Sequence, residues 1–143
     1  MSKKVNISIQ ASNLSLETQS AAQIIADMYN GWAGRNIARH FNQWVYNRIG
    51  GVSVIDVWLD CETSANFDNE TGVHQITRIS PLDPLHRRHT SFVSVSVDGA
   101  ICGDSRVRRY TLDPYERIKD VRTGIERADA QNVLGGDIDM FLK

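Results

Sequence analysis

The chain has 143 residues, a hydrophobic content of 41%, a charged content of 23% and a formal net charge of −1 at pH 7. This length fits one domain with a buried core, and no apolar run approaches the roughly 18 residues of a membrane span. The near-zero net charge neither demands nor excludes RNA as a partner, because phosphate binding depends on local charge. Cys61 and Cys102 lack CxxC spacing, so we expect free thiols in a reducing cytosol.

The first third of the chain predicts a strand followed by a helix. Apolar residues alternate with polar ones at Val5, Ile7 and Ile9. A helix is predicted from about Leu16 to Trp32, with Ser15 as its N-cap and Glu17 in its first turn. Its apolar face consists of Ala21, Ile25, Met28, Tyr29 and Trp32.

The middle of the chain favours strands. Residues 40–49 are ambiguous, and 52–59 form a strand in which Ile55, Val57 and Leu59 share one face. A polar loop is predicted at 61–69. Two further strands are predicted at 73–79 and 91–97, joined by a loop at 80–88 that contains two prolines.

The last third begins with a short connector at 98–105. Its Asp-Gly and Gly-Asp pairs are typical of turns, so we expect 91–97 and 107–112 to pair as antiparallel strands. A helix is predicted at about 128–134, ending at Gly135-Gly136, after which Ile138, Phe141 and Leu142 pack back on the body. The sum is an α+β fold, an antiparallel sheet with its helices on one side.

No sequence motif for catalysis or metal binding is evident. The histidines at 40, 74, 86 and 89 belong to no HExxH motif, and neither GxSxG nor a phosphate-binding glycine loop occurs. The acids in 135–139 are too few for calcium, which needs more oxygen ligands at regular spacing. We therefore predict no cofactor, no metal and no catalytic residue.

A cationic loop carries the first candidate binding residues. Arg87, Arg88 and His89 are consecutive, with Arg78 and His86 nearby. Guanidinium groups donate to phosphates and base edges, and an imidazole can stack on a base, so this loop suits RNA. The same residues also suit a solvated loop with surface ion pairs, and both interpretations stay open at this point. Further cations occur at Arg106, Arg108, Arg109, Arg117, Lys119, Arg122 and Arg127, and pairing of 91–97 with 107–112 would bring many of them together.

Longer motifs add a resemblance to a known family. The segment 70–74 is followed by Arg78-Ile79-Ser80-Pro81-Leu82-Asp83 and by Arg87-Arg88-His89-Thr90-Ser91-Phe92. With 117–126 and 133–141, it resembles bacterial class I peptide chain release factors of the release factor 2 type. The resemblance covers nearly all of residues 1–143, as a single codon-recognition superdomain. It implies the bacterial ribosome as partner, through rRNA and an mRNA stop codon.

The resemblance also implies roles for individual residues. Ser80 and Pro81 match the start of a Ser-Pro-Phe element that contacts the stop codon, and Leu82 takes its third position. His89 matches a histidine that separates the second and third codon bases by stacking, and Thr90 matches a threonine that hydrogen-bonds to bases. The codon- and RNA-binding residues so predicted are Ser80, Pro81, Leu82, Arg87, Arg88, His89, Thr90 and Glu17, the last matching a glutamate beside the first base.

The chain also departs from the family pattern. Leu82 replaces a phenylalanine, so an aromatic contact is lost, and 84–86 replaces a small turn that contains glycine. Residues 13–16 replace a glycine-rich approach to the helix, and Ser20 replaces an acidic residue. We expect these changes to alter codon discrimination while allowing docking to the ribosome.

The largest departure concerns the family's catalytic Gly-Gly-Gln motif. Gly-Gly occurs at 50–51 and at 135–136, and glutamine follows neither. Where the family carries its peptidyl-tRNA-hydrolysing domain, this chain has only the connector 98–105, and the family's N-terminal helical domain is not matched either. We therefore expect a protein that is not an enzyme and cannot release the peptide.

Three hypotheses follow. The first is a cytoplasmic protein that occupies the ribosomal decoding site, recognises stop codons without hydrolysis, and competes in or modulates translation termination. The reduced set of family domains suggests a gene from a phage or mobile element. The second is a release-factor fold co-opted as a structural or interaction component, for example of a phage particle. The third is a subunit that recruits a separate hydrolase. The sequence does not indicate an oligomeric state.

Overall fold

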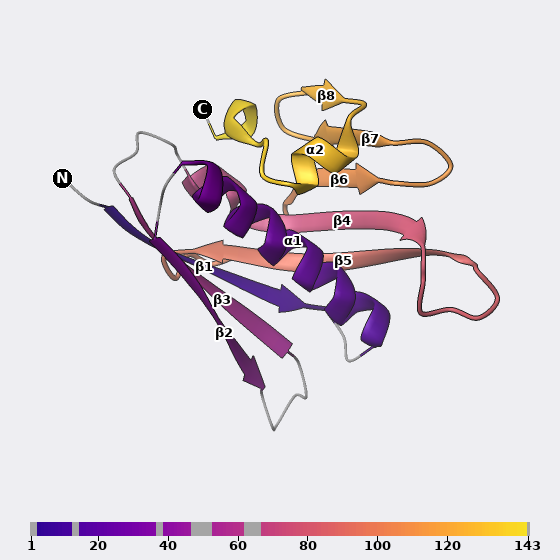
Figure 1. The fold of residues 1–143 in the computed structure, drawn as a ribbon, viewed down its shortest axis with the longest axis horizontal. Coiled ribbons are helices and arrows are strands. Elements are labelled where there is room, and N and C mark those ends of the chain that lie inside the picture. The colour runs from indigo at the N-terminus through magenta and orange to yellow at the C-terminus, as the bar shows by residue number, and fades with distance from the viewer. Residues whose placement is uncertain (1–2, 13–14, 37–38, 47–52, 62–66, 143) are drawn as a thin grey trace.

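The structure, a computed structural model, describes residues 3–12, 15–36, 39–46, 53–61 and 67–142. One eight-stranded sheet, in the order β2-β3-β1-β5-β4-β6-β7-β8, carries two helices on one face (Figure 1). The predicted α+β class is confirmed. In chain order the elements are β1 (Lys3–Ala11), α1 (Leu16–Arg35), β2 (Arg39–Tyr46), β3 (Ser53–Cys61), the 3-10 helix η1 (Phe67–Glu70), β4 (Gly72–Ile79), β5 (Arg88–Val97), β6 (Arg106–Thr111), β7 (Arg117–Asp120), β8 (Glu126–Arg127), α2 (Ala130–Leu134) and the 3-10 helix η2 (Asp139–Phe141).

The predicted pairing of 91–97 with 107–112 is wrong. Strand β4 lies between β5 and β6; it pairs antiparallel with β5 and parallel with β6. The connector 98–105 is long enough to cross the start of β4, where the backbone N–H of Val73 donates to Ser105 O at 2.8 Å. Turn residues predict that the chain reverses, but they do not predict which strand it then joins. Cys102 in this connector is a free thiol, and the side chain of Cys61 is outside the described part.

Helix α1 begins where the sequence predicts and extends three residues further, to Arg35. Ser15 caps it, because its Oγ accepts a hydrogen bond from the backbone N–H of Thr18 at 3.1 Å. The predicted apolar face is confirmed: Ala21, Ile25, Met28, Tyr29 and Trp32 are all buried. Small residues between them, such as Ala22 and Ala26, are buried as well and let the helix approach the strands closely.

The inner face of the sheet follows the predicted alternation. The larger buried apolar side chains of the three central strands near α1 are Val5, Ile7, Ile9, Ile55, Val57, Leu59, Val93, Val95 and Val97. Burying each of these side chains contributes about 1.5–3 kcal/mol, so this layer is the main source of stability. The ambiguous segment 40–49 contains most of β2, and its residues 47–49 lie outside the described part, as do 62–66 of the predicted polar loop.

The C-terminal segment packs against α1 through glycines. A Cβ on Gly31 would collide with the backbone of Gly135, and one on Gly136 would collide with Trp32 N. The helix predicted at about 128–134 is α2. It starts two residues later than predicted, and Gly135 caps its end, as predicted. Ile138, Phe141 and Leu142 are buried, which confirms that this segment returns to the body.

Candidate functional site

The candidate site lies at one end of the sheet, where the loop 80–87 joins β4 to β5 beside the first turn of α1 (Figure 1). Ser80 is buried and its Oγ donates to Glu17 Oε2. Arg78 Nε donates to the other carboxylate oxygen of Glu17 at 2.9 Å. Both oxygens of Glu17 are thus engaged, and they fix the loop to the helix start.

Short-range hydrogen bonds define the shape of this loop. The backbone N–H of Leu82 donates to Ser80 Oγ at 3.1 Å, and that of Leu85 donates to Asp83 Oδ1 at 2.8 Å. His86 has a φ of 51°, a left-handed conformation that is unusual outside glycine. The backbone N–H of Ser80 donates to Arg87 O at 3.2 Å and closes the loop. The loop therefore forms two consecutive turns, and the departure at 84–86 lies in the second of them.

Asp83 organises the cationic side of the loop. Its Oδ2 accepts hydrogen bonds from Arg87 Nε at 2.7 Å and from His89 Nε2 at 2.8 Å. These two bonds, and a third from the backbone of Leu85, hold the pKa of Asp83 well below its usual range. No role is predicted for Asp83 from the sequence, although a lone acid close to several cations is a signal that could have identified it.

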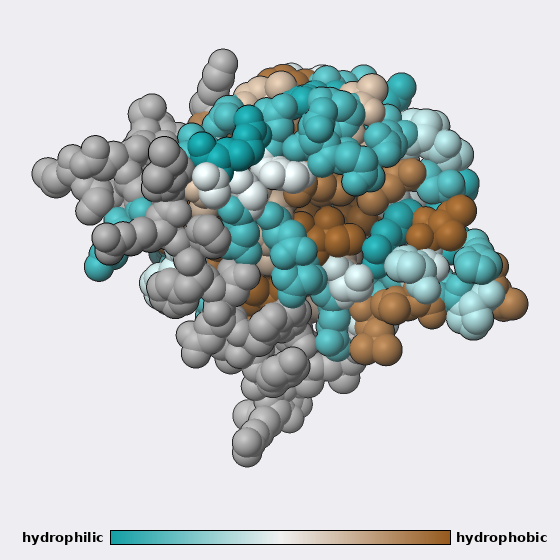
Figure 2. All heavy atoms as spheres, viewed as in Figure 1, coloured by the Kyte–Doolittle hydropathy of each residue, from teal (hydrophilic) through white to brown (hydrophobic). Residues whose placement is uncertain are grey.

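The loop and the helix start enclose an open hollow of about 260 Å³. Its apolar wall includes Leu16 and Leu82, which are 71% and 53% exposed, and Figure 2 shows apolar surface gathered around this end of the molecule. The predicted residues that line it are Glu17, Ser80, Leu82, Arg87 and His89. Apolar walls with a few polar groups suit a flat ring that also forms hydrogen bonds, such as an unpaired nucleobase.

Two predicted site residues lie on the opposite face of the sheet. Successive residues of a strand alternate in direction, so Thr90 points away from the side that His89 faces. Thr90 Oγ1 lies 3.1 Å from Thr77 Oγ1, and Arg88 Nε donates to Asp113 Oδ2 at 2.9 Å. The structure therefore brings most of the predicted set together and separates Arg88 and Thr90 from it. Pro81 is exposed in the loop itself.

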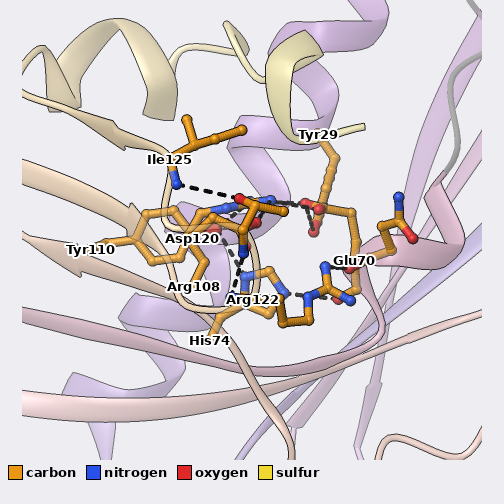
Figure 3. A network of polar contacts seen from close by, with 10 residues as sticks. Tyr29, Glu70, His74, Arg108, Tyr110, Asp120, Arg122 and Ile125 are labelled. Atoms are coloured by element: carbon orange, nitrogen blue, oxygen red, sulfur yellow. Dashed lines mark hydrogen bonds and ion pairs between the residues drawn. The ribbon is translucent and has the colours of Figure 1, made fainter. Parts of the chain in front are cut away.

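The expectation that Arg108 belongs to an RNA-binding basic group is wrong. Its side chain is completely buried, and its two terminal nitrogens donate to Glu70 at 2.9 and 2.5 Å (Figure 3). A bulge in the β4–β6 pairing turns both Val107 and Arg108 inward, which strict alternation does not predict. Arg106 and Arg109 remain exposed, whereas the later cation Arg127 is ion-paired with Asp129 and Asp137.

The same buried network holds a neutral histidine. His74 Nε2 donates to the backbone carbonyl of Glu70 at 2.8 Å, and Tyr110 Oη donates to His74 Nδ1 at the same distance. Burial and the nearby Arg108 lower the pKa of His74 to about 4. Tyr29 Oη donates to Glu70 as well, so the network links α1, η1, β4 and β6 (Figure 3). It holds the fold together and does not face the hollow.

Comparison with known proteins identifies the family. The PCRF domain matches residues 2–95. The chain is 34% identical over 123 residues to "Peptide chain release factor PrfB2, chloroplastic" of Arabidopsis thaliana, covering 82% of this chain and 25% of that protein. It is also 34% identical over 116 residues to peptide chain release factor 2 of Buchnera aphidicola, covering 76% of this chain and 31% of that protein. The chain thus spans a quarter to a third of the length of these relatives.

A solved structure agrees with this assignment at the level of the fold. RF2 of Thermus thermophilus superposes with a TM-score of 0.82 at 19% identity, covering 98% of this chain and 66% of that one. Within the described part of the chain, neither helix is long and apolar enough to cross a membrane. The domain match, the relatives and the shared fold lead to one conclusion: the chain belongs to the PCRF domain family and is a release-factor-2-like domain.

Proposed function

We propose that this protein binds the decoding site of a bacterial-type ribosome at stop codons and does not itself hydrolyse peptidyl-tRNA. The observation that carries the proposal is the hollow between α1 and the loop 80–87. Five residues that the family resemblance assigns to codon and RNA binding line it, although they come from two segments more than sixty positions apart. This convergence of distant segments on one hollow supports a binding site there.

The geometry of the hollow suits an unstacked base. Leu16 and Leu82 offer apolar surface, Arg87 offers the terminal N–H groups of its guanidinium, and His89 offers its ring. Asp83 holds the side chains of Arg87 and His89 in place, so both are oriented before any ligand arrives. Thr90, on the opposite face of β5, would contact a base on the other side of His89. This arrangement supports the role of His89 as a divider between neighbouring bases.

Several observations support a protein without the hydrolytic step. The connector 98–105 lies at the start of β4, and the hollow lies at its end, so the two occupy opposite ends of the sheet. Neither Gly-Gly pair is followed by glutamine. An alignment to peptide chain release factor 2 of Xanthomonas euvesicatoria extends over 230 residues while covering 96% of this 143-residue chain, so the relative has a long segment without a counterpart here.

A ribosome-bound protein that cannot release the peptide would compete with complete release factors. It would slow termination, promote readthrough or occupy an idle decoding site. Such a role places the protein in the cytoplasm of a bacterial host. No observation favours the alternative of a virion component.

Co-sedimentation with bacterial ribosomes tests the proposal. Ribosomes programmed with UGA, UAG or a sense codon in the decoding site are mixed with the purified protein, and peptide release is measured in parallel. We expect stop-codon-dependent binding and no release. Equal binding to all three codons would overturn codon recognition, and absence of binding at low salt would overturn the ribosomal role.

A further inference from the structure

The face of the sheet that points away from α1 and α2 is uncovered among the described residues (Figure 1). Along β4 and β5 its side chains alternate with the buried core, and most of them are polar: Gln75, Thr77, Thr90, Ser94 and Ser96. An open sheet face of this kind is available for a partner.

The strand registers align these outward residues in rows across the sheet. One row runs through Phe92, Gln75, Arg109, Lys119 and Glu126. The next row runs through Thr90, Thr77, Thr111 and Arg117. Thr90, which belongs to the predicted codon-binding set, is therefore in the same row as a cation on β7.

The bulge in the β4–β6 pairing gathers two arginines on this face. Because Val107 and Arg108 both point inward, Arg106 and Arg109 both point outward. Arg106 confirms this direction, since its guanidinium lies 5.2 Å from the ring centre of Phe92 and its Nη1 donates to Gln75 at 3.4 Å. With Arg117 and Lys119 on β7, these arginines form what we call the cationic face.

The charges of the cationic face are largely uncompensated. Within the described part of the chain, Arg106, Arg109 and Arg117 form no ion pair with a carboxylate, whereas Arg78, Arg87, Arg88, Arg108 and Arg127 all do. Lys119 is 3.7 Å from Glu126, a pair that is almost half exposed and therefore weak. Outward positions repeat about every 6.6 Å along a strand, so the four cations span about 13 Å.

We propose that the cationic face binds the phosphates of a single-stranded RNA segment that continues past Thr90. A chain with a net charge of −1 has concentrated four cations in one place, next to a row of hydroxyl groups that can also donate to phosphates. Tyr115, 54% exposed beside Arg117, adds an aromatic ring on which a base can stack. The proposal rests on the proposed function in that the RNA would be a strand of the programmed ribosome.

The salt dependence of RNA binding tests this inference. A labelled polyuridylate oligomer is titrated with the wild-type protein, with Arg109→Gln and with Arg106→Gln/Arg109→Gln over a series of salt concentrations. Each phosphate contact contributes about 0.7 to the slope of log affinity against log salt for a single strand. We expect the slope to become shallower by about 0.7 for the single variant and about 1.4 for the double variant.

Arg35→Gln is the matched control. Arg35 is half exposed at the end of α1, on the helix side of the sheet, and its loss removes the same charge. We expect this variant to keep the wild-type slope. Equal slopes for Arg35→Gln and Arg109→Gln, or no binding of the oligomer at low salt, would overturn the inference.

Binding of the wild-type protein to programmed ribosomes separates this inference from the proposed function. If the wild type binds ribosomes and Arg109→Gln binds them as tightly as Arg35→Gln does, RNA binding by the cationic face is overturned while the proposed function stands. If the wild type fails to bind ribosomes but the oligomer slopes change as expected, the ribosomal role is overturned and the RNA-binding face stands.

Discussion

Two clusters in this protein each join a carboxylate, an arginine and a histidine, and they differ in burial. Glu70, Arg108 and His74 are completely buried beneath the helices. In the loop cluster, the side chain of Asp83 is 5% exposed, whereas those of Arg87 and His89 are 66% and 36% exposed. Similar chemistry therefore serves two ends: the buried cluster ties elements of the fold together, and the loop cluster shapes a surface that a ligand can reach.

The largest effect, on stability, should follow from breaking the buried ion pair between Glu70 and Arg108. Glu70→Ala takes away the hydrogen-bonded carboxylate of buried Arg108, leaves it only the more distant carboxylate of Asp120 at 3.9 Å, and removes the partner of Tyr29. We expect the free energy of unfolding to fall by about 3–5 kcal/mol, or the protein to fail to fold. Urea unfolding followed by circular dichroism measures the change.

The double variant Glu70→Leu/Arg108→Met tests whether the poorly compensated guanidinium of Arg108 is the cause. It removes both charges of the pair, and Asp120 keeps its hydrogen bonds from the backbone N–H groups of Arg122 and Thr123, so much of the lost stability should return. A double variant as unstable as Glu70→Ala would show that the loss comes from something other than this guanidinium.

The second-largest effect is a dependence of stability on pH, which arises from the buried side chain of His74. In the unfolded chain His74 takes up a proton near its ordinary pKa of 6.5, whereas in the folded protein its pKa is about 4. Between these values the unfolded state binds more protons, so stability falls as the pH is lowered and is fully retained above 6.5. The total change is on the order of 3 kcal/mol, measurable by urea unfolding at a series of pH values.

His74→Gln is the reference for this measurement. It removes the titrating group, and although its absolute stability will be lower, its pH dependence between 6.5 and 4 should be flatter. If the two proteins lose stability in parallel over this range, His74 is not the group responsible. Glu70, whose pKa Arg108 lowers from 4.5, begins to lose its contribution only at the acidic end of this range, below about 4.5.

The sequence predicts local features of this fold well and non-local ones poorly. The cap at Ser15 and the buried alternation of Val93, Val95 and Val97 are local patterns, and both are confirmed. The insertion of β4 between β5 and β6 depends on contacts between distant segments, which turn residues cannot specify. Similarly, Arg108 was grouped with the neighbouring cations as a basic residue, whereas its burial depends on an ion pair with Glu70, 38 positions away in the sequence.

The candidate site shows the same division. Family motifs supplied Ser80 and His89, which the structure brings to one hollow. They did not supply Asp83, because its importance comes from two hydrogen bonds that exist only once the loop is folded. Nor did they predict that His89 and Thr90, adjacent in sequence, would face opposite sides of the sheet, although strand alternation implies it.

Removing the charge of the loop cluster should give the third effect, on binding and not on stability. Asp83→Asn keeps an oxygen that can accept from the backbone of Leu85 but loses the negative charge that holds Arg87 and His89. We expect an unfolding curve close to that of the wild type and a several-fold loss of affinity for ribosomes at a stop codon. Asp27→Asn, which removes the same charge from an exposed position of α1 outside the hollow, is the control.

The smallest effect should come from adding an aromatic ring to the hollow. Leu82 lines the hollow and is 53% exposed, so Leu82→Phe adds a flat surface for a codon base at little cost to the fold. Stacking of a base on an aromatic side chain is worth about 1–3 kcal/mol, and leucine already supplies part of that contact. We expect stop-codon-dependent binding to ribosomes to tighten a few-fold. Leu85→Phe is the control, because it places the same ring on an exposed part of the loop outside the hollow. Tighter binding by both variants would indicate non-specific hydrophobic binding. Tighter binding by neither variant would argue against a base in this hollow.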